Sequence, residues 1–499
     1  MSTQLSAVSD IRFPDRAPSL RLGRCIAVSG RLPVVLSREE GASWRVSPAG
    51  GPLIAALTPV LRERKGIWIG WPGVEARDAR GLSKVLAGAI HEGFSLRPVM
   101  LSDQERRQGF AGFSGEILWP LFHGLPLDCS FPAGHWQSFL RVNRKFARAT
   151  AKALARGAGG TDLVWVHDAV LMNLAVELRR LKAPGRTAFF LHLPFPSREQ
   201  FLKLPWREQL LAGLLAFDQV GFQTEGDLEN FLSVVEALAP ASLQTRTGNR
   251  AGAFPIGVDA REVEARAARP EVVARGEALR ASLSGRQLVL GIDRIDRAKG
   301  IPEKLRSFAE ALTRFPELRG RVTLVQVVLP SRDGLPQHVA LRSEIERLVG
   351  EVNGSFGRLG WVPVHYVHRE LHPDELLAYY RAADVALVTP LKAGMNLTAK
   401  EFCAVNPEGR GVLVLSEFAG AAAQLATGAL LVNPFDALGV ARALRRALGL
   451  KERERAARMR RLRDEVRRHD VSWWASSFLA AALGGQPEEI PAQDLRSRL

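Results

Sequence analysis

The chain has 499 residues and a formal net charge of +16, and this length suits two or three domains of ordinary size. Hydrophobic residues make up 46% of it and charged residues 24%, which is typical of a soluble globular protein, and no apolar run is long enough to cross a bilayer. The positive charge suits nucleic acid, an anionic membrane or an anionic small substrate, or it is simply a solvated Arg-rich surface. Because the basic residues are scattered without interleaved aromatic residues, as over 451–468, we expect neither a nucleic-acid nor a membrane partner.

The first 20 residues contain no apolar segment of a secretory signal, so we expect a disordered lead over residues 1–20. The three cysteines, Cys25, Cys129 and Cys403, lie far apart and lack the spacing of a metal site. Scattered cysteines of this kind fit a reducing compartment. We therefore expect a cytoplasmic protein that needs no metal ion or other cofactor.

Short apolar runs alternate with helical patterns through the first half, which predicts a doubly wound α/β domain with a mainly parallel sheet. A Gly-rich turn over 47–51 precedes a helical pattern over 53–61. The pattern weakens over 239–252, so we place the domain junction there and assign 21–245 to the first Rossmann-like domain. The apolar segments of this domain are residues 24–29, 66–73, 117–122, 163–168, 187–196 and 219–224.

A second alternating series predicts a second Rossmann-like domain over residues 246–465. An Arg-rich helical stretch over 452–483 carries Trp473 and Trp474, which we expect to pack against a domain face. Residues 466–485 are thus assigned to a helix that packs back on the domains, and 486–499 to a tail. The predicted strands of the second domain are 287–292, 322–329, 362–366, 385–388, 412–416 and 430–432.

Polar residues and glycines follow several of the predicted strands, among them Asp168, His192, Arg294 and Gly394. In open α/β sheets, ligands bind outside the carboxyl ends of the strands. Two such domains in tandem are therefore expected to bind ligands in a cleft between those ends.

Residues 389–401 (TPLKAGMNLTAKE) connect a buried strand to a helix. Pro390 ends the strand, Gly394 permits a tight turn, and Asn396 begins the helix. A helix N-terminus offers unpaired N–H groups to a phosphate or a sugar hydroxyl, and Glu401 is placed to reach a ribose. The alternative interpretation is an ordinary strand-to-helix connection.

Two cations, Arg294 and Lys299, follow the predicted strand 287–292 in a loop that opens a helix. Such a pair is well placed to hold a diphosphate and to neutralise a leaving nucleotide. Taken alone, the pair is better explained as solvated surface charge than as an anion site.

The stretch GMNLTAKE resembles the signature of the trehalose-6-phosphate synthase family, retaining glycosyltransferases of the GT-B type with two Rossmann-like domains (glycosyltransferase family 20). The similarity runs from Arg24 to Trp474 and includes R-x-D-x-x-K-G at 294–300, VWVHDAVLM around Asp168 and FFLHLPFP around His192. The sequence departs from the family at Ala393, where an acidic residue is usual, and at Phe110, Ala169 and Val170.

The resemblance implies a nucleotide-sugar donor site and a phosphorylated-acceptor site. Catalytic roles are implied for Asp168, His192, Arg294 and Lys299. The implied donor-binding residues are Gly50, Gly51, His192, Arg294, Lys299, Gly394, Met395, Asn396, Leu397 and Glu401. The implied acceptor-binding residues are Arg31, Trp71, Phe110, Trp119, Asp168 and Arg332.

By resemblance, we expect transfer of glucose from UDP-glucose to glucose 6-phosphate with retention, giving trehalose 6-phosphate and UDP. The leaving diphosphate accepts the acceptor's proton on the same face, so no protein nucleophile is required. One alternative is a glucosylglycerol-phosphate synthase that uses glycerol 3-phosphate. Another, suggested by Ala393, is a non-catalytic sugar-phosphate-binding paralogue. The sequence is also compatible with a homo-oligomer.

Overall fold

The computed structural model divides the chain into two compact units. Unit 1 comprises Met1–Ile256 and Val471–Leu499, and unit 2 comprises Gly257–Asp470. No described helix is long and apolar enough to cross a membrane. The described residues are 23–37, 44–49, 51–74, 81–82, 85–86, 90–91, 93–125, 130–156, 161–240, 250–330, 336–406 and 409–484.

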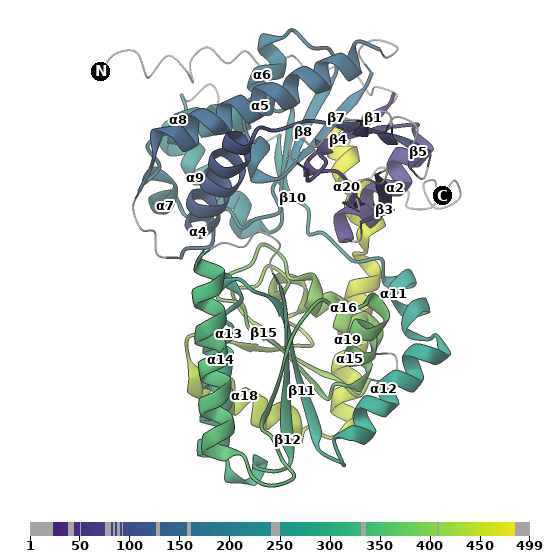
Figure 1. The fold of residues 1–499 in the computed structure, drawn as a ribbon, viewed down its shortest axis with the longest axis vertical. Helices are drawn as coiled ribbons and strands as arrows, with labels where there is room; N and C mark the ends of the chain where they lie inside the picture. Colours follow the sequence, from purple (N-terminus) through teal and green to yellow (C-terminus); the bar gives the residue numbers. More distant parts are fainter. Residues whose placement is uncertain are drawn as a thin grey trace. The chain divides into compact units, whose positions relative to one another are not determined.

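Unit 1 is built on an eight-stranded sheet in which neighbouring strands pair in parallel except β5 with β6. The strand β1 lies inside the sheet, between β4 and β7, and later strands add on both sides of it (Figure 1). In sheet order the strands are β10 (Ala251–Ala253), β9 (Gln219–Phe222), β8 (Arg186–Phe190), β7 (Leu163–His167), β1 (Cys25–Arg31), β4 (Ile67–Trp71), β6 (Phe94–Pro98) and β5 (Ile90–His91).

Helices cover this sheet because each buries one apolar stripe. On α5 (Ala133–Leu154), Phe139, Val142 and Phe146 follow a helical spacing and are fully buried. A separate hairpin pairs β2 (Val34–Ser37) with β3 (Arg45–Pro48). The described residues of unit 1 also form α2 (Pro52–Glu63), the π-helix η2 (Glu105–Leu118), α4 (Trp119–Phe122), η3 (Ala169–Leu171), α6 (Leu174–Arg180), α7 (Arg198–Leu202), α8 (Arg207–Leu215), α9 (Glu225–Leu238) and α20 (Val471–Ala482).

Unit 2 contains a six-stranded sheet in which all neighbouring strands pair in parallel. These strands are near-continuous apolar runs because helices cover both of their faces. The sheet order reverses direction between β11 and β14, which makes this pair the topological switch point. In sheet order the strands are β13 (Val364–His368), β12 (Val322–Leu329), β11 (Gln287–Arg294), β14 (Val385–Val388), β15 (Val412–Ser416) and β16 (Leu430–Val432).

The helices of unit 2 lie in two layers (Figure 1). One layer contains α13 (Ile301–Arg314), α14 (Pro336–Phe356) and α18 (Ala437–Gly449). The other contains α11 (Ala260–Ala267), α12 (Pro270–Ser282), α15 (Pro373–Ala382), α16 (Leu397–Val405) and α19 (Glu452–Arg468). The described part of unit 2 also contains the short helices η4 (Arg297–Lys299), η5 (Pro316–Leu318) and α17 (Ala422–Leu425).

The two-domain α/β fold expected from the sequence is confirmed, but the C-terminal stretch differs from the expectation. Residues 452–483 were expected to form one helical stretch, whereas the structure has α19 and α20, which belong to different units. The break comes at His469 and Asp470, whose backbone leaves no room for a Cβ at Gly257. As expected, Trp474 is buried; Trp473 is only partly buried.

Candidate active site

In unit 2, the switch point brings together two loops that the sequence singled out. Arg294 is the last residue of β11, and residues 389–396 follow β14, which pairs with β11. The backbone N–H of Leu391 donates to the carbonyl of Ala298 at 2.8 Å, so the two loops lie side by side. This is the edge at which doubly wound sheets bind their ligands.

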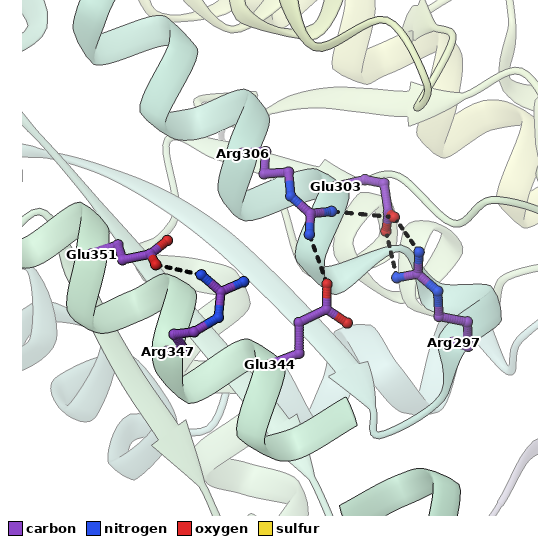
Figure 2. Close-up of polar contacts among 6 residues, drawn as sticks. All are labelled: Arg297, Glu303, Arg306, Glu344, Arg347 and Glu351. Carbon is purple, nitrogen blue, oxygen red and sulfur yellow. Dashed lines mark hydrogen bonds and ion pairs between the residues drawn. The ribbon is translucent and has the colours of Figure 1, made fainter. Parts of the chain in front are cut away.

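Arg294 is exposed and Lys299 is half-buried, and neither forms an ion pair with any described residue. Burial, and next the positive charge of Arg294, lower the pKa of Lys299. Arg297 lies in the same loop but binds Glu303 at 2.5 Å, and Glu303 also contacts Arg306 (Figure 2). Arg294 and Lys299 are therefore available to bind an anion, whereas the charge of Arg297 is already neutralised by Glu303.

A buried polar cluster holds the end of β11, where the loop that carries Lys299 begins. Lys304 Nζ contacts Asp293 Oδ2 at 2.5 Å, and Gln326 Nε2 donates to the same oxygen at 3.0 Å. Lys304 and Gln326 are almost completely buried. Because Asp293 directly precedes Arg294, this cluster fixes the end of β11 from which Arg294 projects.

The loop before α16 is held by backbone hydrogen bonds to residues 418–421. Ala393 donates to Phe418 at 3.2 Å and accepts from Gly420 at 2.9 Å, and Met395 accepts from Ala421 at 2.9 Å. The backbone N–H groups of Gly394 and Met395 have no hydrogen-bond partner among the described residues. They are suited to an anion or a sugar hydroxyl.

Asn396 adopts the left-handed conformation at the start of α16, with φ 97°. Its side-chain oxygen accepts from the N–H of Ala399 at 3.3 Å and so caps the helix. Sequence reasoning assigned the turn to Gly394 and missed this cap, although Asn tolerates such a conformation better than most residues.

Glu401 accepts a hydrogen bond from the hydroxyl of Tyr380 at 2.9 Å. Burial raises the pKa of Glu401, and the Tyr380 hydrogen bond opposes that rise. Tyr380 lies on α15 and was not singled out from the sequence, because nothing in its helical pattern distinguishes it from a core residue.

In unit 1, the corresponding position is the end of β1 beside β7. Asp168 follows β7 with φ 72°, and its Oδ2 accepts from the N–H of Gly30 at 2.7 Å. Burial raises the pKa of Asp168, and the Gly30 hydrogen bond opposes that rise. A non-glycine residue with such a φ is strained, and such strain is concentrated at functional sites.

Three of the expected acceptor residues lie together near Gly30. The guanidinium of Arg31 is 4.9 Å from the centre of the Trp71 ring, and that ring is 5.8 Å from Phe110. A Cβ at Gly30 would meet the Phe110 ring at 3.1 Å, so this glycine makes room for it. Together with Asp168 they form a cluster with a cation, flat rings and a carboxylate.

The remaining expected residues are more dispersed. Trp119 begins α4 and its ring lies 4.2 Å from that of His123. Gly51 is the N-cap of α2 with φ 143°, a conformation that favours glycine. His192 follows β8, and burial lowers its pKa to about 4. Gly50 and Arg332 lie outside the described residues.

The chain is similar to known proteins over most of its length. The trehalose-6-phosphate synthase of Mycolicibacterium smegmatis is 41% identical over 474 residues, which cover 91% of this chain and 92% of the relative. The Mycobacterium tuberculosis enzyme of the same name is 41% identical over 481 residues, covering 93% of this chain and 95% of the relative.

Solved structures give the same result. An E. coli structure bound with UDP-2-fluoro glucose has a TM-score of 0.82 at 31% identity and covers 94% of this chain and 100% of its own. A Burkholderia xenovorans alpha,alpha-trehalose-phosphate synthase in complex with glucose-6-phosphate has a TM-score of 0.80 at 33% identity, covering 93% and 100%. The expected GT-B fold and glycosyltransferase class are thus confirmed. Because the model of Glycosyltransferase family 20 matches residues 23–483, the chain belongs to that family.

Proposed function

We propose that the protein is a UDP-forming alpha,alpha-trehalose-phosphate synthase that transfers glucose from UDP-glucose to glucose 6-phosphate with retention. The observation that carries this proposal is the pair Arg294 and Lys299, which have no ion-pair partner among the described residues, beside the unpaired N–H groups of Gly394 and Met395. The names of the relatives and the ligands of the solved neighbours point to the same substrates.

The donor's diphosphate binds to Arg294 and Lys299, and the N–H groups of Gly394 and Met395 add hydrogen bonds to phosphate or sugar oxygens. Glu401 accepts from the ribose hydroxyls. This needs the ionised carboxylate, which the Tyr380 hydrogen bond favours against burial. Asn396 and Leu397 fix the helix start from which these groups project.

The acceptor's phosphate binds to Arg31 and Arg332 through charge-assisted hydrogen bonds, while Trp71 and Phe110 pack against the sugar. Asp168 accepts from acceptor hydroxyls, and the Gly30 N–H holds its carboxylate in place. Phe110 offers no hydroxyl, so the phosphate relies on the two arginines.

In the reaction, the bond between the anomeric carbon and the diphosphate oxygen breaks while a bond to the acceptor oxygen forms on the same face. The departing phosphate oxygen takes the acceptor's proton. Arg294 and Lys299 stabilise the charge that develops on the diphosphate, which lowers the barrier because this interaction is stronger in the transition state. His192 contacts the donor glucose.

We further propose a cytoplasmic location. Cys25 and Cys403 are buried thiols that form no disulfide, and burial raises the pKa of Cys25 to about 12, which keeps it unreactive. Buried thiols of this kind fit a reducing compartment.

The test is product analysis with purified protein, UDP-glucose and a panel of glucose 6-phosphate, glycerol 3-phosphate and unphosphorylated glucose. We expect UDP release and an α,α-linked disaccharide phosphate with glucose 6-phosphate. Arg294→Ala should abolish most of the turnover, whereas Arg297→Ala, a matched loss of charge from the same loop, should retain it because Glu303 already neutralises Arg297. Preference for glycerol 3-phosphate, or ligand binding without turnover, would refute the proposal.

A further inference from the structure

We propose that Gln223 is a positioning residue for glucose transfer, which holds the His192 ring in its neutral form with the proton on Nε2. This inference rests on the proposed function, because it takes His192 to contact the donor glucose. It concerns a hydrogen-bonded chain inside unit 1 that runs from the backbone of Ile256 through Gln223 and His192 to His167.

The chain consists of three contacts. The N–H of Ile256 donates to Gln223 Oε1 at 3.0 Å, Gln223 Nε2 lies 3.5 Å from His192 Nδ1, and His192 Nε2 lies 3.1 Å from His167 Nδ1. Gln223 and His167 are buried, with 1% and 0% of their surfaces exposed. His192 between them is partly exposed, so Gln223 and His167 are the two groups that depend on their protein partners.

The chemistry of the amide determines where the protons lie. An amide nitrogen only donates, and turning the Gln223 amide over would set its NH₂ group against the N–H of Ile256, donor against donor. His192 Nδ1 therefore accepts, so the proton of the neutral ring is on Nε2 and is donated to His167 Nδ1. His167 in turn carries its proton on Nε2, a buried atom with no partner among the described residues.

A second proton on His192 would place an N–H against the NH₂ group of Gln223. The other groups packed on the ring are His167 from β7, Phe190 from β8 and Trp474 from α20, and of these only His167 titrates. Burial lowers the pKa of His192 to about 4 and holds the pKa of His167 well below its usual range. Both rings are thus neutral at pH 7.

A neutral ring matters for the chemistry. When the nucleotide departs, positive charge develops on the glucosyl ring. An imidazolium beside it would repel that charge, whereas a neutral imidazole does not. Gln223 thus acts on the reaction through His192 without touching the donor.

Both segments through which the chain passes between the units take part in this arrangement. Ile256 is the last residue of unit 1 before the first crossing, and Trp474 lies just after the second crossing at Val471. The Trp474 ring is 6.2 Å from that of His192. The His192 ring is therefore linked through Gln223 to Ile256, where the chain leaves unit 1, and packs near Trp474, where the chain re-enters it.

Gln223→Glu tests this directly, because it keeps the size of the side chain and an oxygen for the Ile256 N–H but replaces the NH₂ donor by an acceptor. Nitrogen NMR of the labelled histidine rings, with His192 assigned by its loss in His192→Asn, reports the protonation state. We expect His192 Nδ1 to carry a proton at pH 7 in the variant but not in the wild type. Titration should show about tenfold weaker binding of UDP-glucose with unchanged binding of UDP.

Gln219→Glu is the matched control, since it puts the same buried charge on β9, and it should leave both readouts unchanged. The proposal is overturned if His192 in Gln223→Glu keeps an unprotonated Nδ1 between about pH 6 and 8. It is equally overturned if UDP-glucose binding matches the wild type, or if Gln219→Glu changes both readouts to the same extent. Because neither readout needs turnover, failure of the proposed reaction is detected separately, by product analysis of the wild type.

Discussion

Lys400→Met should make the protein more stable at neutral pH, and the advantage should shrink as the pH rises. Lys400 lies on α16 with 1% of its surface exposed, and its Nζ donates to Gln424 Oε1 at 2.6 Å. Burial disfavours the charged ammonium and lowers the pKa of Lys400 to about 7, although Glu465 acts in the opposite direction.

The pKa shift sets the size and sign of the effect. The pKa of Lys400 falls from 10.5 to about 7 on folding, so between these values the unfolded state binds more protons than the folded state. Stability therefore increases with pH across this window. From Lys400 alone, the free energy of unfolding of the wild type should rise by about 2 kcal/mol between about pH 7 and 9. The Lys400→Met variant has no titrating group at this position and should show no such rise.

The assay is urea denaturation of wild type and variant at several pH values, followed by circular dichroism. The free-energy difference between them should fall by about 2 kcal/mol from about pH 7 to 9. Lys203→Met is the matched control, because Lys203 also donates to a glutamine amide, that of Gln200 at 3.2 Å, but is exposed. If Lys400→Met follows the wild type in parallel at every pH, Lys400 does not titrate in this range and the reasoning is refuted.

Three further predictions concern the donor site. Tyr380→Phe should raise the pKa of Glu401 further and weaken UDP binding, by about 0.5–1.5 kcal/mol in calorimetry, with the loss growing as the pH falls; an unchanged affinity would contradict the ribose role. Lys299→Ala should lower kcat/KM by an amount that corresponds to about 1.5–3 kcal/mol of lost transition-state stabilisation, without a change in thermal stability. A wild-type rate in this variant would exclude Lys299 from the diphosphate site. Ala393→Asp should raise kcat/KM for UDP-glucose by several-fold to about a hundredfold; if the rate falls while another nucleotide sugar is turned over well by the wild type, glucose is not the natural donor.

Features of the fold that depend on a local pattern of residues could be predicted from the sequence. Short, continuous apolar runs between helical segments predicted β7, β11 and β14, because a strand that is buried on both faces must be apolar along its whole length. The order of strands and helices implied two doubly wound sheets, and Asp168, Arg294 and Gly394 were expected at the carboxyl ends of strands, although β11 extends through Arg294 where a loop was expected. Apolar periodicity and the order of strands and helices repeat over a few residues, so both can be recognised in the sequence.

The contacts between side chains that are distant in the sequence became visible in the folded chain alone. Gly30 and Asp168 are 138 residues apart and touch because β1 lies beside β7. Tyr380 reaches Glu401 because α15 packs on α16. Arg294 and Arg297 look alike in the sequence, yet only Arg297 is neutralised, by Glu303. Such pairings depend on sheet order and helix packing, which arise from the whole core, so no periodicity within one segment specifies them.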